Sequence, residues 1–209
     1  MKIEILQQQF ILNPYGSMYW PKEKMLIVAD LHLGKIDHLR KHGSALPNLS
    51  NAVDYIHLEQ NIATYKPEKL VFLGDLFHST LNNSWYIFEQ WVQRQPVEFT
   101  LVIGNHDVIP VKRFEALGFS IEYYLDISGF SFTHIPEEKK DLFNVCGHVH
   151  PGFKLRGKGR QQINLSCFYQ KENQLILPAY GSFTGNYYIK PDENEHVYAL
   201  SEESVIKVF

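Results

Sequence analysis

The sequence predicts a single domain of the α/β class. Its length, a series of apolar runs that end in polar residues, and stretches of helical periodicity between those runs all support this. The chain has 209 residues, which is enough for one substantial core and short for two domains. Hydrophobic residues make up 44% and charged residues 21%, which is typical of globular rather than disordered chains. We therefore expect one domain over residues 1–209.

Four runs of β-forming residues end abruptly in polar side chains that are able to bind metal. In open α/β sheets, ligands bind at the carboxyl ends of the strands, so these ends are expected to meet. The runs are Met25–Asp30, Leu70–Asp75, Phe99–His106 and Leu142–His150.

Helical spacing fills the intervals between the first three runs. Asn48–Tyr65 has apolar residues at helical positions and begins with a good capping residue, Asn48. Asn83–Gln93 has the same periodicity. Two successive βα units predict parallel strand pairing.

Shorter strands are expected at both ends of the chain. Ile3–Leu12, a turn at residues 13–16, and Met18–Trp20 predict a hairpin at a sheet edge. After Gly118, short runs broken by turn residues predict a second and more antiparallel sheet. These runs are Phe130–His134, Gln161–Phe168, Leu175–Leu177 and Val205–Phe209.

Charge and cysteine content exclude several classes of protein. The formal net charge is −3, so no overall positive field indicates a polyanionic partner, and any nucleic acid must be held locally. Residues 1–12 have neither the layout of a signal peptide nor that of a membrane span. Two cysteines are too few for a disulfide scaffold. We expect a cytoplasmic protein without a membrane partner.

The polar strand ends together supply seven candidate metal ligands. Their carboxylate, imidazole and amide groups suit borderline divalent ions, with Mn²⁺ preferred and Fe²⁺ or Zn²⁺ as alternatives. Seven ligands exceed the needs of one ion, so we expect two ions that share a carboxylate. Glycines 74, 104 and 147 precede the polar clusters and allow close backbone approach. The candidates are Asp30, His32, Asp75, Asn105, His134, His148 and His150.

Such a metal pair predicts hydrolysis of phosphate esters. Two ions roughly 3.5 to 4 Å apart hold a bridging hydroxide and clamp the phosphate oxygens. A serine or cysteine nucleophile is then unnecessary, and the buried position expected for Cys146 gives it no chemistry. His106 follows Asn105 and is placed to protonate the leaving group, with Asp107 as the partner that fixes its tautomer.

These residues, in this order, resemble the calcineurin-like metallophosphoesterases. The family pattern is Asp-x-His, Gly-Asp, Gly-Asn-His-Asp, a lone His and Gly-His-x-His, and all five blocks occur between residues 30 and 150. The resemblance implies a four-layer α/β/β/α sandwich of two facing mixed sheets. It also implies one ion held by Asp30, His32, Asp75 and His150, and a second held by Asp75, Asn105, His134 and His148.

Longer motifs resemble the bacterial ligase-associated DNA-damage-response phosphoesterases, often named PdeM. They include Asp30–Lys35, Gly74–Ser79, Gly147–Pro151 and Leu177–Gly185. This resemblance implies a phosphodiesterase or DNA endonuclease that acts beside a DNA ligase and a helicase. His78 stands where many superfamily members carry an acid or amide, and is a candidate metal or phosphate contact.

Several residues outside the ligand set are candidate substrate contacts, and each also has a purely structural interpretation. Lys35 either binds a second phosphate or lies on a polar helix face. Residues 154–160 carry four positive charges and either grip phosphates, through Arg156, Lys158 and Arg160 among others, or form a solvated hairpin turn. Tyr180, Phe183 and Thr184 either flank the substrate or only turn the chain.

The leading hypothesis is a metal-dependent phosphodiesterase that acts on DNA or a related nucleotide ester, including a role as an endonuclease in DNA repair. A phosphomonoesterase or nucleotide pyrophosphatase would use the same metal centre, because the ligands set the reaction and leave the outer pocket open. A non-catalytic binding scaffold is the alternative from a different class, and the intact ligand set argues against it.

Overall fold

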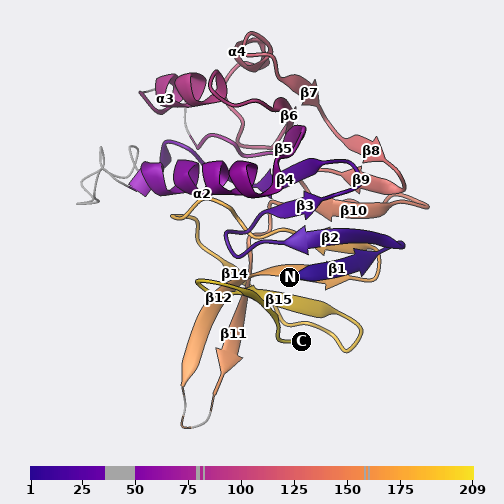
Figure 1. The fold of residues 1–209 in the computed structure, drawn as a ribbon. Coiled ribbons are helices and arrows are strands. Elements are labelled where there is room, and N and C mark those ends of the chain that lie inside the picture. The colour runs from indigo at the N-terminus through magenta and orange to yellow at the C-terminus, as the bar shows by residue number, and fades with distance from the viewer. Residues whose placement is uncertain (36–49, 79–80, 82, 158, 160) are drawn as a thin grey trace.

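The structure is a computed structural model, and it describes residues 1–35, 50–78, 81, 83–157, 159 and 161–209. Two β-sheets face each other, and helices cover the outer side of the first (Figure 1). The described helices are too short or too polar to serve as a membrane span.

The first sheet has seven strands in the order β1-β2-β3-β4-β5-β6-β7. Strands β1 to β4 pair antiparallel and β4 to β7 pair parallel, as the two βα units predict. Its strands are β1 (Lys2–Ile5), β2 (Gln8–Leu12), β3 (Met18–Trp20), β4 (Met25–Ala29), β5 (Lys69–Leu73), β6 (Glu98–Val102) and β7 (Ser120–Glu122).

The N-terminal strands differ from the prediction. Ile3–Leu12 is not one strand but a hairpin of β1 and β2, because Leu6 and Gln7 adopt left-handed backbone angles (φ 48° and 60°) that reverse the chain. The predicted hairpin, with its turn at residues 13–16, is confirmed between β2 and β3. The predicted edge position is confirmed for β1.

Three helices are described, and their apolar sides cover the first sheet. α2 (Ser50–Tyr65) and α3 (Asn83–Val92) correspond to the two predicted helices, and α4 (Val111–Glu115) is a short third helix. Leu58 of α2 and Phe88 of α3 are fully buried in a cluster with Leu26, Leu70 and Phe72 of the sheet. Burial of large apolar side chains stabilises such a layer, at about 25 cal/mol per Å² of apolar surface.

The second sheet is mixed and lies against the other face of the first. Strand β10 pairs parallel with β9 and β13 at its centre, and antiparallel pairs surround it. Its strands are β8 (Leu125–Ile127), β9 (Phe130–Phe132), β10 (Phe143–Cys146), β11 (Pro151–Arg156), β12 (Gln162–Lys171), β13 (Gln174–Ile176), β14 (Tyr187–Tyr188), β15 (His196–Leu200) and β16 (Val205–Lys207).

The main core lies between the two sheets. Ile27 and Val71 of the first sheet pack with Phe132, Val145 and Phe168 of the second, and all five are fully buried. The predicted fold class, two facing mixed sheets with flanking helices, is confirmed. Among the described residues, however, the outer face of the second sheet is covered by Ile189 and Val208 rather than by a helix.

This arrangement brings the ends of several strands to one edge. Ala29 lies beside Leu73, and Leu73 beside Val102, so β4, β5 and β6 end at the same level. Phe132 of β9 pairs with Val145 near the end of β10 in the facing sheet. The polar residues that follow these strands therefore meet at one edge of the sandwich.

Candidate metal centre

Sharp turns follow the strands and redirect the candidate ligands toward one another. Residues two apart on an extended strand point to opposite faces, so a turn is required for them to converge. Left-handed backbone angles are uncommon for residues other than glycine and cluster at functional sites. Five of the candidate ligands have them: Asp30 (φ 55°), His32 (φ 49°), Asp75 (φ 50°), His148 (φ 67°) and His150 (φ 51°).

Asp30, His32 and His150 form the first ligand group. His150 Nε2 lies 3.2 Å from Asp30 Oδ1 and 3.4 Å from His32 Nε2. Asp30 Oδ1 is buried and has no hydrogen-bond donor among the described residues. An uncompensated buried carboxylate oxygen is costly, and a bound cation would offset that cost.

Asp75, His134 and His148 form the second ligand group, and Asn105 joins it. His134 Nδ1 donates a hydrogen bond to the carbonyl of Leu73 at 2.9 Å, which leaves its Nε2 unprotonated when the ring is neutral. That nitrogen faces Asn105 Oδ1 at 2.8 Å, Asp75 Oδ1 at 3.3 Å and His148 Nδ1 at 3.1 Å. Lone pairs that face one another at these distances fit a metal ion between them.

The carboxylate of Asp75 lies between the two groups. Its Oδ1 faces His134 Nε2 at 3.3 Å, and its Oδ2 faces His32 Nε2 at 4.0 Å. The geometry therefore offers one oxygen to each group, as a bridging ligand requires. Within the described residues, these two groups are the clusters of three or more histidine, cysteine or acidic side chains arranged to hold an ion.

Desolvation keeps two of the candidate ligands, His32 and His148, in the form that binds metal. It lowers the pKa of His32 to about 4, although the carboxylates of Asp30 and Asp75 oppose this effect. His148 is exposed, but partial desolvation and the neighbouring His134 lower its pKa as well. Neutral imidazole is the ligating form, so both side chains are ready to bind an ion at neutral pH.

The glycines before the ligands are required for close approach, as expected. A Cβ at Gly147 would lie 2.5 Å from Asp30 Oδ2 and 2.7 Å from Ala29 Cβ. Gly74 has φ 71°, and a Cβ there would collide with the His134 ring. A side chain at either position would displace a candidate ligand.

Asp107 has a different set of partners from the expected one. Its carboxylate accepts backbone N–H groups from Gly104 at 2.8 Å, Asp75 at 3.0 Å and Leu76 at 2.9 Å. The predicted hydrogen bond to His106 is not among the described contacts. Burial raises the pKa of Asp107, and the bonds from these backbone groups oppose that rise. Asp107 thus holds together the loops after β5 and β6, because its oxygens are occupied by the backbone.

Two further histidines surround His32. The exposed His106 lies on the loop after β6, with its ring centroid 6.4 Å from that of His32, and its backbone N–H donates to Asp75 Oδ1 at 2.9 Å. The half-buried His78 has its ring centroid 5.9 Å from that of His32. Both predicted residues therefore lie beside the ligand groups.

The predicted substrate contacts are divided between two regions. Lys35 is half-buried and lines a small hollow with His32. Arg156 is exposed at the end of β11, six residues beyond His150 and hence about 20 Å away along an extended strand. The β11–β12 hairpin projects from the rest of the molecule (Figure 1). Lys158 and Arg160 lie outside the described residues.

The segment after β13 packs against the metal centre. Tyr180 is buried, and its hydroxyl accepts a hydrogen bond from Asn61 Nδ2 at 3.1 Å. Ser182 donates to the buried Asp54 on α2 from both its backbone N–H and its hydroxyl. Asp54 was not among the residues predicted from the sequence, and the apolar spacing of this helix gave no signal of its burial, because its neighbour Val53 is 38% exposed.

Neither cysteine is available for chemistry. Cys146 and Cys167 are free and buried, and burial raises the pKa of both thiols. This agrees with the expectation for Cys146.

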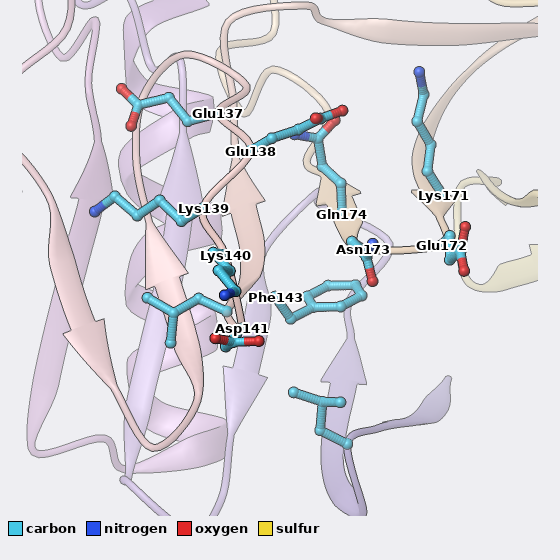
Figure 2. A pocket seen from close by; sticks show the side chains of 12 residues that line it. Glu137, Glu138, Lys139, Lys140, Asp141, Phe143, Lys171, Glu172, Asn173 and Gln174 are labelled. Carbon is cyan, nitrogen blue, oxygen red and sulfur yellow. The ribbon is translucent and has the colours of Figure 1, made fainter.

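Another hollow lies against the loop before β10 (Figure 2). Its lining mixes acids such as Glu137 and Glu172 with lysines such as Lys139 and Lys171. Because its charges are of both signs, this hollow favours neither anionic nor cationic ligands. None of the candidate metal ligands lines the hollow.

A comparison with protein families identifies this centre. The profile of the calcineurin-like phosphoesterases matches residues 23–199. The chain belongs to the calcineurin-like phosphoesterase family. The matched range includes all seven candidate ligands, so this calcineurin-like phosphoesterase is a metal-dependent hydrolase with two candidate metal-binding groups.

The chain was also compared with solved structures. The chain is similar to the nuclease MPE of Pseudomonas putida, with 26% identity over 100% of this chain and 99% of that one, at a TM-score of 0.82. Yfce, a phosphoesterase from E. coli, is 18% identical over 88% of this chain and 97% of its own, at a TM-score of 0.44. No curated protein matches the calcineurin-like chain.

Proposed function

We propose that the protein is a phosphodiesterase that cleaves DNA or a related nucleotide ester, as an endonuclease in DNA repair. The observation that carries the hydrolytic part of this proposal is the position of Asp75, which presents one carboxylate oxygen to each ligand group. A bridging carboxylate is the feature that a two-ion centre needs and that a single-ion site does not.

Two divalent ions are the proposed cofactors, with Mn²⁺ preferred and Fe²⁺ or Zn²⁺ as alternatives. Asp30, His32 and His150 would hold one ion, and Asn105, His134 and His148 the other, with Asp75 shared. When bound, such ions supply a nucleophilic water at neutral pH and Lewis-acid stabilisation of the phosphate.

His106 is the proposed general acid. Its backbone is anchored to the Asp75 carboxylate, while its side chain is exposed and close to the ligand groups. From this position the imidazole would give its proton to the leaving oxygen. Lys35 and His78, on the His32 side, are proposed phosphate contacts, and Arg156, Lys158 and Arg160 remain proposed contacts to a longer polymer.

A diester substrate is preferred for two reasons. Asn105, His106 and His148 are exposed, so the centre is open enough for a phosphate within a chain. The similarity to a nuclease also extends over the whole chain.

A DNA ligase and a helicase are the proposed partners, because the motifs of this chain resemble those of the ligase-associated phosphoesterases. Two free, buried cysteines agree with the proposed cytoplasmic location.

The test compares bis-aryl phosphate, mono-aryl phosphate and DNA as substrates. Turnover would be measured with Mn²⁺, Fe²⁺, Zn²⁺, Co²⁺ and Ni²⁺, with chelator-treated protein as the control, and anomalous scattering would locate the ions. We expect diester hydrolysis to exceed monoester hydrolysis with at least one ion. Faster monoester hydrolysis would instead support a phosphomonoesterase on the same centre.

A further inference from the structure

A hollow of about 460 Å³ lies on the outer face of the second sheet and is here called the outer hollow. Its size is within the range of roughly 300 to 1,000 Å³ that is typical of ligand sites. Among the described residues, none of the candidate metal ligands lines it, so it is a site distinct from the metal centre. Its lining includes Val149, Tyr169, Lys171, Ile176, Tyr187 and Lys190.

The loops that carry metal ligands form one rim of the outer hollow. Val149 lies between the candidate ligands His148 and His150, but its side chain packs with the apolar cluster of the outer face. Pro136, two residues after the ligand His134, also lines the hollow. Since successive Cα atoms are about 3.8 Å apart, the turn at Val149 separates the hollow from ligands of both groups by the width of one residue. A polymer that is bound at the metal centre and crosses this turn enters the outer hollow.

The outer hollow offers an exposed aromatic ring above an apolar floor. Tyr187 is 67% exposed, and its backbone N–H donates to the carbonyl of His150 at 2.9 Å, which fixes where the side chain begins. Ile176 and Tyr169 are buried and form part of the floor. The hydroxyl of Tyr169 donates to Glu195, so the polar end of that side chain is already satisfied. An exposed ring beside an apolar floor suits a flat ligand.

The charged groups of the outer hollow are positive. Lys171 and Lys190 are both exposed, and Lys171 Nζ lies 5.4 Å from the centroid of the Tyr169 ring. No acidic side chain lines the hollow in the part of the chain that the structure describes. The nearby acids Glu137 and Glu172 line the other hollow, and Lys171 lies on the boundary between the two (Figure 2). The local charge therefore favours an anionic ligand, although the chain as a whole has a net charge of −3.

We infer that the outer hollow binds unpaired nucleotides of a nucleic acid strand whose scissile phosphate lies at the metal centre. This inference rests on the proposed phosphodiesterase function, and it adds a binding site outside the centre. A base would stack on Tyr187, and the phosphates beside it would contact Lys171 and Lys190, which is how single strands are held with little dependence on sequence. Only unpaired bases offer a free flat face, so a duplex would not use this site.

Two sets of substitutions separate the base contact from the phosphate contacts. Tyr187→Leu removes the flat ring and keeps apolar volume, and Lys171→Gln with Lys190→Gln removes two charges. Because all three side chains are exposed, the fold should be retained, and Tm would be measured for each variant.

Matched controls make the same changes elsewhere on the surface. Tyr86→Leu alters a tyrosine that is 62% exposed on helix α3. Lys22→Gln with Lys69→Gln removes two exposed charges, and Lys69 begins β5 at the end of that strand opposite to the ligands.

The experiment measures the affinity of chelator-treated protein for a fluorescent thymidine strand by anisotropy at several salt concentrations. Chelation prevents cleavage during the measurement. A second strand of the same length carries abasic sites throughout, so that it keeps the phosphates and lacks the bases. Turnover of bis-aryl phosphate by the Mn²⁺-loaded proteins reports on the metal centre separately.

We expect Tyr187→Leu to lower the affinity for the thymidine strand by about 5- to 150-fold, the effect of one stacked base, and to match the parent on the abasic strand. The double glutamine variant should reduce the slope of log affinity against log salt by about 1.4 on both strands, since each lost phosphate contact on a single strand removes about 0.7. Both variants should hydrolyse bis-aryl phosphate at the parent's rate, and both controls should match the parent in every measurement.

The inference is overturned if Tyr187→Leu binds the thymidine strand as the parent does, or if it loses the same factor on both strands. A salt slope that the glutamine substitutions leave unchanged would also overturn it. If the parent hydrolyses bis-aryl phosphate but does not bind the thymidine strand, the inference fails and the proposed hydrolysis stands. If the parent binds the strand through Tyr187 but hydrolyses no phosphodiester with any ion, the proposed function fails instead.

Discussion

Asp30 Oδ2 accepts a hydrogen bond from the backbone N–H of His148 at 2.8 Å. Asp30 follows a strand of the first sheet and His148 follows a strand of the second, so this bond joins candidate ligands from the two sheets. The other oxygen of Asp30 lies 3.2 Å from His150 Nε2. The relative position of the two sheets and the geometry of the ligands are therefore coupled. A change that separates the sheets at this edge would also separate the ligand groups.

Asp75→Asn is expected to abolish phosphodiester hydrolysis and to lower the metal content at both positions. The bridging negative charge offsets the repulsion between two nearby cations, and a neutral amide does not. Elemental analysis of the purified variant and its turnover of bis-aryl phosphate would check this. Two ions retained per chain would contradict the bridging role.

His106→Ala is expected to keep both ions and lose turnover. General acid catalysis contributes roughly 10²- to 10⁴-fold, so kcat should fall within that range. The measurement combines kcat for a phosphodiester with metal content and thermal unfolding. If metal is lost together with rate, His106 is a ligand instead.

Asp107→Ala is expected to destabilise the protein, because three backbone N–H groups lose their acceptor. The cost should be on the order of 3 kcal/mol in the free energy of unfolding, since leaving buried donors unsatisfied costs about 1 to 3 kcal/mol each and some will recruit water. Urea unfolding would measure the free energy of unfolding of this variant, with the parent and His106→Ala as controls. A variant with unchanged stability and reduced kcat would restore the original interpretation, in which Asp107 orients His106.

Asp54→Asn is expected to change how stability depends on pH. Burial raises the pKa of Asp54 to about 6, although the bonds from Ser182 oppose this rise. A carboxyl group with a raised folded-state pKa contributes its full stability below the unfolded value of 3.8, and that contribution is lost as pH rises through about 6. The stability of Asp54→Asn relative to the parent should therefore increase between pH 4 and 7, by roughly 3 kcal/mol for a shift of about two units.

Chemical denaturation at several pH values, in chelator, would test this difference. Other titrating groups cancel because both proteins carry them. A difference between the two proteins that is constant from pH 4 to 7 would show that Asp54 is not protonated within the fold in this range.

Replacing Lys154, Arg156, Lys158 and Arg160 with alanine is expected to weaken DNA binding and flatten its salt dependence. Each lost phosphate contact reduces the number of released counterions by about one. Turnover of bis-aryl phosphate should be unchanged, because Arg156 is far along β11 from His150. The test is to measure the DNA affinity of the parent and of the four-alanine variant at several salt concentrations and to compare the two slopes. An unaltered salt slope would mean that the basic hairpin does not contact the strand.

Much of the fold was predictable because it depends on local periodicity. Helix α3 and the parallel strands β4, β5 and β6 follow from apolar spacing. Helix α2 forms where it was predicted, but Val53 and Ile56 of its apolar residues are exposed, and Leu58 and Ile62 face the core. The hairpin of β2 and β3 was predicted, but the preceding hairpin of β1 and β2 was not, because its turn at Leu6 and Gln7 contains neither glycine nor proline. Such a turn leaves no signal in composition, since its conformation is imposed by the pairing of β1 with β2.

The sequence by itself determined which groups are available for chemistry, because ligand types and their spacing are local properties of the chain. Only the tertiary structure decided which group meets which. Asp107 binds backbone groups instead of His106, and Asp54 holds Ser182 across 128 residues. The contacts of Asp107 with Asp75 and Leu76 depend on the pairing of β5 with β6, and that of Asp54 with Ser182 depends on how helix α2 packs. Partners so far apart in the chain have no mutual spacing that a sequence pattern could reveal.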